Sequence, residues 1–163
     1  MRLLVWGNPI PTDAFCINIF FTMEMTKYQL GLAGEYAVCA ELLKRGKLAS
    51  LTMGNAKGMD VLVFDETDKN RNYKVVEVKT TQDKKFVTSF FNKYYDRTQP
   101  HPDVWVLVHI DEQLQTQFYV LTHEELGEIQ MKRNKITTWE KSSGCDNVLL
   151  KDVEQFQNMW EKI

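Results

Sequence analysis

Two charged residues at strand spacing offer a starting point: Glu77 and Lys79 are separated only by Val78, inside an apolar-rich segment at 73–80. Because side chains alternate along a strand, Glu77 and Lys79 point to the same face, about 6.5–7 Å apart. Asp60 begins the preceding apolar run, and it can meet Glu77 if the two strands pair as a hairpin. Two carboxylates that face each other repel unless a cation lies between them. The spacing therefore favours a divalent-metal site with a lysine beside it.

Such a site has the chemistry needed to cleave a phosphate ester. Mg²⁺ prefers hard oxygen ligands and keeps several of its own waters. When bound, it polarises a phosphoryl oxygen, lowers the pKa of a bound water and orients the attack. Lys79 then lies within reach of the charge that develops on the phosphate, or of the attacking water. Charged residues also alternate on exposed strands without any catalytic role, so this pair needs support from the residues around it.

Glu35 provides that support from a predicted helix. The helix begins with a capping box of Thr26 and Gln29, runs to about Arg45 and ends at Gly46. The neighbours of Glu35 on the helical wheel are mostly apolar: Leu32, Val38, Cys39 and Leu42. A carboxylate on the packing side of a helix is costly unless it is paired or bound to a metal. The helix should pack on the strands that follow it, which would bring Glu35 to the same site.

The remaining elements follow from hydrophobic spacing and turn residues. Strands are predicted at 48–53, 59–64, 73–80, 104–110 and 117–121, with a short one at 148–150. Helices are predicted at 85–96, from the recurrence of Phe86, Phe90 and Tyr94, and from Thr122 to about Lys132. A final helix is predicted from apolar residues on one face: Val153, Phe156, Trp160 and Ile163. The continuous apolar run at 104–110 indicates a strand buried on both faces.

The order of these motifs resembles the PD-(D/E)XK nuclease superfamily. The resemblance rests on a capped helix with an inward Glu35, then Gly58-Met59-Asp60, then the strand motif Glu77-Val78-Lys79-Thr80. It covers roughly residues 26–110, and Met59 stands where the family motif has proline. The early part of the chain is similar to Holliday-junction resolvases and small restriction-type or repair nucleases, and the whole looks more like other small bacterial members of the superfamily.

The resemblance implies a fold, a metal and a set of roles. The fold is an α/β, restriction endonuclease-like one, with an αβββαβ core, a mixed central sheet flanked by helices, and a C-terminal β-α-β-α extension. Glu35, Asp60 and Glu77 would be metal ligands, and the carbonyl of Val78 would add another. Lys79 would be the catalytic lysine, acting with Asp60 and Glu77. The expected cofactor is Mg²⁺ or Mn²⁺.

Composition limits the partners and the setting. The net charge is −2 and the pI about 5.9, so contact with nucleic acid must come from a local basic patch. Three cysteines (Cys16, Cys39 and Cys145) form no C-x-x-C pair and are expected to be idle thiols in a reducing cytoplasm. No apolar stretch reaches the roughly eighteen residues that a membrane span needs.

The sequence predicts one nuclease-like domain at 26–163, preceded by an N-terminal extension at 1–25 that the domain does not need. The leading hypothesis is a metal-dependent endonuclease acting on nucleic acid, with DNA preferred, and cutting both strands would favour a homodimer. One alternative is a binding or assembly module that keeps the fold without activity. Another is a metal-dependent hydrolase of a different phosphate ester.

Overall fold

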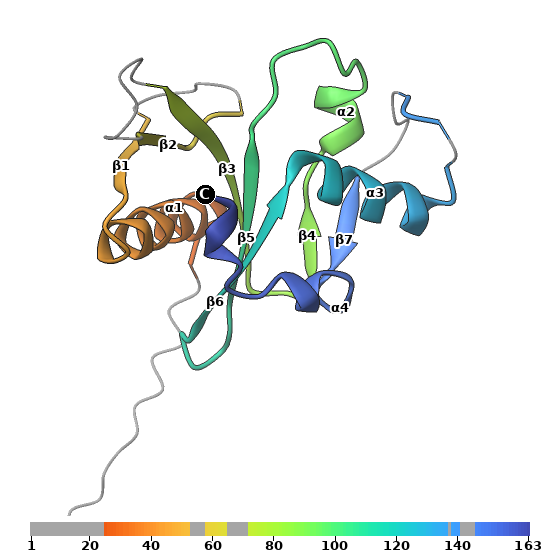
Figure 1. The fold of residues 1–163 in the computed structure, drawn as a ribbon. Coiled ribbons are helices and arrows are strands. Elements are labelled where there is room, and N and C mark those ends of the chain that lie inside the picture. The colour runs from red at the N-terminus through yellow and green to blue at the C-terminus, as the bar shows by residue number, and fades with distance from the viewer. Residues whose placement is uncertain (1–24, 53–57, 65–71, 137, 141–145) are drawn as a thin grey trace, which may run out of the picture.

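The computed structural model describes residues 25–52, 58–64, 72–136, 138–140 and 146–163 (Figure 1). The predicted N-terminal extension lies almost entirely outside the described residues, so its dispensability stays a prediction. Among the described residues, no helix combines the length and the apolar character needed to cross a membrane.

The first helix, α1 (Lys27–Lys44), begins and ends at the predicted signals. The Thr26 hydroxyl accepts a hydrogen bond from the Gln29 N–H, and the Gln29 side chain accepts one from the Thr26 N–H at 3.0 Å. At the other end, Gly46 adopts a positive φ of 74°, and the Lys47 N–H donates to the Leu42 carbonyl. A glycine in this conformation satisfies carbonyls that the last turn leaves open. Local sequence therefore sets both ends of α1.

A five-stranded mixed sheet forms the centre of the molecule, as predicted. Its strands lie in the order β1-β2-β3-β5-β6. Their bounds are β1 Leu48–Leu51, β2 Val61–Phe64, β3 Tyr73–Thr81, β5 Val104–Ile110 and β6 Thr116–Thr122. β3 and β5 run parallel, whereas the other neighbours are antiparallel. Because side chains alternate along β3, its residues belong to two faces of the sheet, and different elements cover each face.

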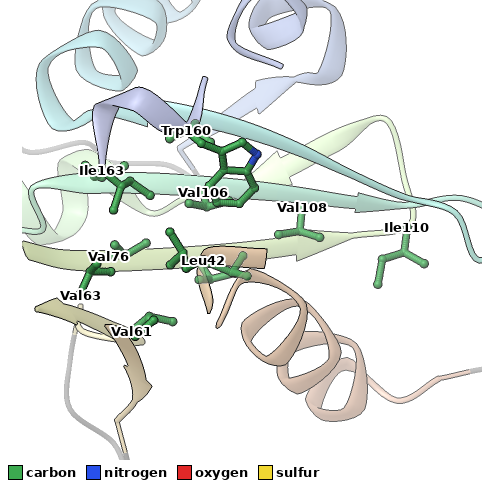
Figure 2. Packing of buried hydrophobic residues seen from close by; sticks show 14 residues of the cluster. Leu42, Val61, Val63, Val76, Val106, Val108, Ile110, Trp160 and Ile163 are labelled. Atoms are coloured by element: carbon green, nitrogen blue, oxygen red, sulfur yellow. The ribbon is translucent and has the colours of Figure 1, made fainter. Parts of the chain in front are cut away.

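One face of the sheet is covered by α1 and by the C-terminal turns (Figure 1). Leu42 of α1 packs there with Trp160 and Ile163 from the end of the chain (Figure 2). The sheet contributes a row of valines to this core: Val61, Val63, Val76, Val78, Val104, Val106, Val108 and Val120. β-branched side chains suit this close contact between a helix and a pleated surface.

The other face of the sheet is covered by α2 (Phe90–Tyr94), α3 (His123–Asn134) and a second, two-stranded sheet. That small sheet pairs β4 (Lys85–Val87) with β7 (Asn147–Leu149) in antiparallel register. The core here is aromatic and aliphatic, with Trp105 and Leu107 of β5 facing Phe90 and Leu126. Because Glu77 and Lys79 lie opposite Trp105 and Leu107 in the register, they belong to this face.

Two predicted helices were wrong. The segment predicted as a helix at 85–96 begins with a strand, β4, and continues with the five-residue α2. Ser89, between the two, has a positive φ of 53°, which separates the strand from the helix. The predicted C-terminal helix is a four-residue α4 (Leu150–Val153) followed by two short 3₁₀ turns, η1 (Glu154–Phe156) and η2 (Trp160–Lys162). Asn158, at φ 58°, interrupts the helical path between those turns.

Candidate active site

Glu77 is the centre of the site. Its side chain is fully buried, and each carboxylate oxygen has charged or polar partners. Oε1 lies 2.7 Å from the Lys79 ammonium and 2.8 Å from that of Lys93, while Oε2 accepts a hydrogen bond from the Tyr94 hydroxyl at 2.6 Å. Burial alone would raise the pKa of Glu77, but the charge and hydrogen bond of Lys79, then the bonds from Lys93 and Tyr94, hold it below its ordinary value. Glu77 is therefore a buried carboxylate kept ionised.

Asp60 meets the same stretch of β3, as the hairpin prediction required. Its N–H donates to the Val76 carbonyl at 3.0 Å, and its Oδ2 accepts the Val78 N–H at 2.7 Å. Burial raises the pKa of Asp60; the Val78 N–H and the Lys79 charge lower it, and the charge of Glu77 raises it further. At neutral pH the Asp60 carboxylate is thus held in an environment that disfavours its charge.

Lys79 lies between the two carboxylates and solvent. Besides its ion pair with Glu77, its ammonium donates to the Val78 carbonyl at 3.3 Å and lies 6.0 Å from the centre of the Trp105 ring. About a quarter of its side chain (26%) is exposed. The Val78 carbonyl, a predicted ligand, therefore accepts a hydrogen bond from Lys79 in this structure. The side chain of Lys79 is thus partly open to solvent.

Glu35 approaches Asp60 and Lys79 from the helix side of the sheet. Helix α1 covers the valine-lined face, whereas Glu77 and Lys79 lie on the opposite face of the sheet. Glu35 is half-buried; burial raises its pKa, the Asp60 charge raises it further, and the Lys79 charge lowers it. It therefore interacts electrostatically with Asp60 and Lys79 without entering the hydrogen-bond network of Glu77. Within the part of the chain that the structure describes, no three His, Cys, Asp or Glu side chains are gathered closely enough to hold a metal.

The donor set nevertheless suits a hard divalent cation. The three carboxylates and the Val78 carbonyl are all oxygen donors, the type that Mg²⁺ and Mn²⁺ prefer. Both Glu35 and Asp60 have pKa values raised partly by a neighbouring carboxylate, Asp60 in one case and Glu77 in the other. A cation placed between these groups would relieve that repulsion. The chemistry of the residues fits the metal, although the carboxylates are not gathered around one point.

Sequence reasoning missed Lys93 and Tyr94 as neighbours of Glu77. Its helical spacing with Phe86 and Phe90 favoured a place for Tyr94 in the core, and Tyr94 is indeed buried. Its hydroxyl, however, donates to Glu77. Burial, then the Glu77 charge, raises the pKa of Tyr94, so the phenol stays neutral and remains a donor. One feature of the sequence could have indicated them. Lys93 and Tyr94 carry polar groups, yet they follow Phe90 and Phe91, which are typical of a buried core.

Gly58 lies directly against this network. Its φ is +75°, and a Cβ built on it would overlap the Tyr94 hydroxyl and come to 3.4 Å from Glu77 Oε2. Glycine is needed here both for its backbone conformation and for the space it leaves. The geometry around Gly58 therefore explains why the first residue of the Gly-Met-Asp motif is a glycine.

Replacing Gly58 with alanine is expected to lower the free energy of unfolding by about 1–3 kcal/mol, through backbone strain and displacement of Tyr94. Gly46→Ala is the matched control, because Gly46 has a similar φ of +74° but no atom within 4 Å of its added Cβ. Chemical denaturation of both variants measures the difference. Equal losses would show that the backbone alone matters and that Tyr94 is not displaced.

Comparison with protein-family models and with curated proteins gives no match to the sequence. Two solved structures resemble the fold. The bacterial homing endonuclease I-Ssp6803I superposes with a TM-score of 0.50 at 15% identity, over 83% of this chain and 89% of that one. Hjc, a Holliday junction resolvase from Archaeoglobus fulgidus, gives a TM-score of 0.48 at 14% identity, over 80% and 98%. The likeness to the homing endonuclease supports the restriction endonuclease-like fold that the sequence predicted.

Proposed function

We propose that this chain is a divalent-metal-dependent endonuclease that hydrolyses phosphodiester bonds in nucleic acid, with DNA as its substrate. The observation that carries the proposal is the grouping of a buried, ionised Glu77 with Asp60 and Lys79 on one face of a restriction endonuclease-like sheet. Burial and the charge of Glu77 disfavour the Asp60 carboxylate where it lies, and a role in binding a cation would account for that cost.

Each residue has a distinct task in this proposal. Asp60 and Glu77, with Glu35 and the Val78 carbonyl, would hold Mg²⁺ or Mn²⁺, which when bound lowers the pKa of water and neutralises phosphate charge. The Val78 N–H orients the Asp60 carboxylate by its 2.7 Å hydrogen bond. Lys79 places its ammonium where negative charge develops on the phosphate in the transition state. Its partial exposure gives the phosphate access to that charge.

The proposal that the substrate is DNA rests on observations other than the geometry of the site. The structurally similar proteins are named as a homing endonuclease and a Holliday junction resolvase. With a net charge of −2, the chain must contact DNA through local cations rather than through its overall charge. A nuclease of this kind would act in the cytoplasm, and cleavage of both strands would favour a homodimer.

Two measurements test the proposal. The purified chain is incubated with supercoiled plasmid, with Mg²⁺, Mn²⁺ or EDTA, and nicking and linearisation are followed on gels; cleavage with either metal and none with EDTA is expected. In parallel, saturating Mg²⁺ is expected to raise the melting temperature, since a ligand bound only by the folded state stabilises it. Cleavage of small phosphate esters but not of plasmid would favour the other hydrolase hypothesis.

A second candidate function is supported by one observation. Glu77 is already neutralised by two lysines, and the described residues contain no gathered three-carboxylate site. Those facts suit a nucleic-acid-binding or assembly module that keeps the fold without catalysis. Such a module would show no melting shift with Mg²⁺ and no cleavage with either metal, and gel-shift assays would still detect DNA binding.

A further inference from the structure

Helix α2 holds both oxygens of Glu77 without help from Lys79. Lys93 reaches Oε1 at 2.8 Å and Tyr94 reaches Oε2 at 2.6 Å. The two residues are adjacent in the chain and take one oxygen each, so the carboxylate plane is fixed from one side. The two contacts together are called the α2 clamp below.

Because of the clamp, Glu77 needs only one of its two lysine partners to neutralise its charge. Lys79 and Lys93 both contact the same oxygen, Oε1, although one cation neutralises one carboxylate. If Lys79 turned away, Glu77 would keep an ammonium at 2.8 Å and a phenol at 2.6 Å. A buried carboxylate that retains a cation and a hydrogen bond does not carry the large penalty of an unpaired buried charge.

The segment that carries the clamp is firmly anchored. Two groups of Asp146 bind it. The carbonyl accepts the Thr88 N–H at 2.9 Å, the Thr88 hydroxyl at 3.3 Å and the Ser89 N–H at 3.4 Å, and the carboxylate accepts the Asn92 N–H at 3.1 Å. Trp139 adds a further contact, donating from its indole to the Tyr94 carbonyl at 2.8 Å. Phe90, on the same helix, is fully buried. The segment that carries the clamp is thus fixed by hydrogen bonds from Trp139 and Asp146, which lie far along the chain.

Lys79 differs from Lys93 in where its charge acts. Its second hydrogen bond goes only to the neighbouring Val78 carbonyl, on its own strand. Its charge influences Asp60 more strongly than that of Lys93 does, and it also influences Glu35, on which Lys93 has no resolved effect. The charge of Lys79 therefore acts on all three carboxylates, whereas Lys93 contacts Glu77 from α2.

We propose that Lys93 and Tyr94 are positioning residues, which hold both carboxylate oxygens of Glu77 in place while Lys79 leaves Glu77 to contact the scissile phosphate. The inference rests on the proposed nuclease function and deepens it. The clamp gives the site two lysines with separate tasks: one stays with the carboxylate, and the other serves the substrate. Because positioning affects the reaction more than the affinity for DNA, its loss should appear in kcat rather than in KM.

Kinetics of three variants test the division of tasks. Lys93→Met is expected to lower kcat about 10- to 100-fold while KM for DNA changes less than about threefold, and Lys93→Arg should restore most of the rate. Tyr94→Phe, which removes only the hydroxyl, is expected to lower kcat about 10-fold. Lys151→Met, which removes an exposed lysine on α4, is the control and should leave both constants unchanged. A raised KM with unchanged kcat in Lys93→Met would place Lys93 on the DNA backbone and overturn the proposal.

A second measurement needs no activity. In the metal-free protein, Lys79→Met and Lys93→Met are each expected to lower the melting temperature by less than about 2 °C, because the remaining lysine still pairs with Glu77. The double variant leaves Glu77 without a cation and should lose about 6 °C or more, well beyond the sum of the single effects. Additive losses would overturn the clamp. If the wild type cleaves nothing, the proposed function fails, but this cycle still decides whether the clamp exists.

Discussion

Replacing Asp60 with asparagine is expected to reduce metal-dependent cleavage on the order of 10³-fold without lowering the melting temperature of the metal-free protein. Asparagine keeps an oxygen that can accept the Val78 N–H, so the local backbone geometry is retained. It removes a carboxylate whose charge is disfavoured by burial and by Glu77. Activity and stability should therefore change in opposite directions, which is the signature of a group kept for function.

The pH dependence of stability sharpens this prediction. In the folded protein the pKa of Asp60 lies above its ordinary value of 3.8, so the folded chain takes up this proton at a higher pH than the unfolded chain does. The wild type therefore gains stability relative to Asp60→Asn as the pH falls through the raised pKa toward 3.8. Denaturation curves at several pH values measure the gap. A variant that is less stable than wild type at neutral pH would mean that Asp60 stabilises the fold as an ion-pair partner.

Replacing Lys79 with alanine is expected to lower cleavage by roughly 10²–10³-fold, because the ammonium stabilises charge that develops only in the transition state. The melting temperature should change by no more than a few degrees, since Glu77 keeps Lys93 and Tyr94. The shift in melting temperature that Mg²⁺ causes should also persist, because the lysine is not a ligand. Melting curves with and without Mg²⁺, alongside plasmid cleavage, provide both readouts.

Other results for these variants would support a purely structural role of the residues. If Lys79 and Glu77 formed only a structural ion pair, Lys79→Ala would leave the rate of cleavage unchanged, and the change in melting temperature would stay small because Glu77 keeps Lys93 and Tyr94. If both the Asp60 and the Lys79 variants melt well below the wild type, and Mg²⁺ shifts the melting temperature of none of the three proteins, the non-catalytic module is the remaining explanation.

Much of the fold was predictable because its signals are local. The capping box at Thr26 and the glycine at Gly46 set α1, and the alternation of residues in 73–80 placed Glu77 and Lys79 on one face. Asp60 was placed correctly because a short hairpin leaves few possible registers, and the observed pairing of Val61 with Val76 carries Asp60 to Glu77. These inferences needed only neighbours in sequence and the geometry of strands.

The errors fall where distant segments decide the structure. Phe86, Phe90 and Tyr94 recur at helical spacing, and all three are buried, but β4 pairs with β7 some sixty residues later, with Lys85 opposite Leu149. A burial pattern of this length fits a helix or a strand followed by a turn equally well. The predicted C-terminal helix was wrong for the same reason. Gln157 forms an isolated β-bridge to Tyr119, so the segment does not continue as one helix.

The position of Glu35 shows a further limit. Its apolar neighbours correctly predicted the packing side of α1, and Val38 and Leu42 are buried there. Helical periodicity gives no information about which face of the sheet receives the helix, and Glu77 lies on the other one. The clamp residues were missed for a related reason: Lys93 and Tyr94 meet Glu77 only through tertiary packing of α2.

The pairing of β4 with β7 also determines when the site can be completed during synthesis. Asp60, Glu77, Lys79, Lys93 and Tyr94 leave the ribosome long before Asp146 and β7, which anchor the segment carrying the last two. Because domains fold as their segments emerge, an unfinished chain can form the central hairpin but not the anchored α2. A nascent or C-terminally shortened chain would thus carry the proposed ligands for metal without their fixed arrangement. Synthesis of the segment that contains Asp146 and β7 is then the step after which the proposed site can take its fixed arrangement.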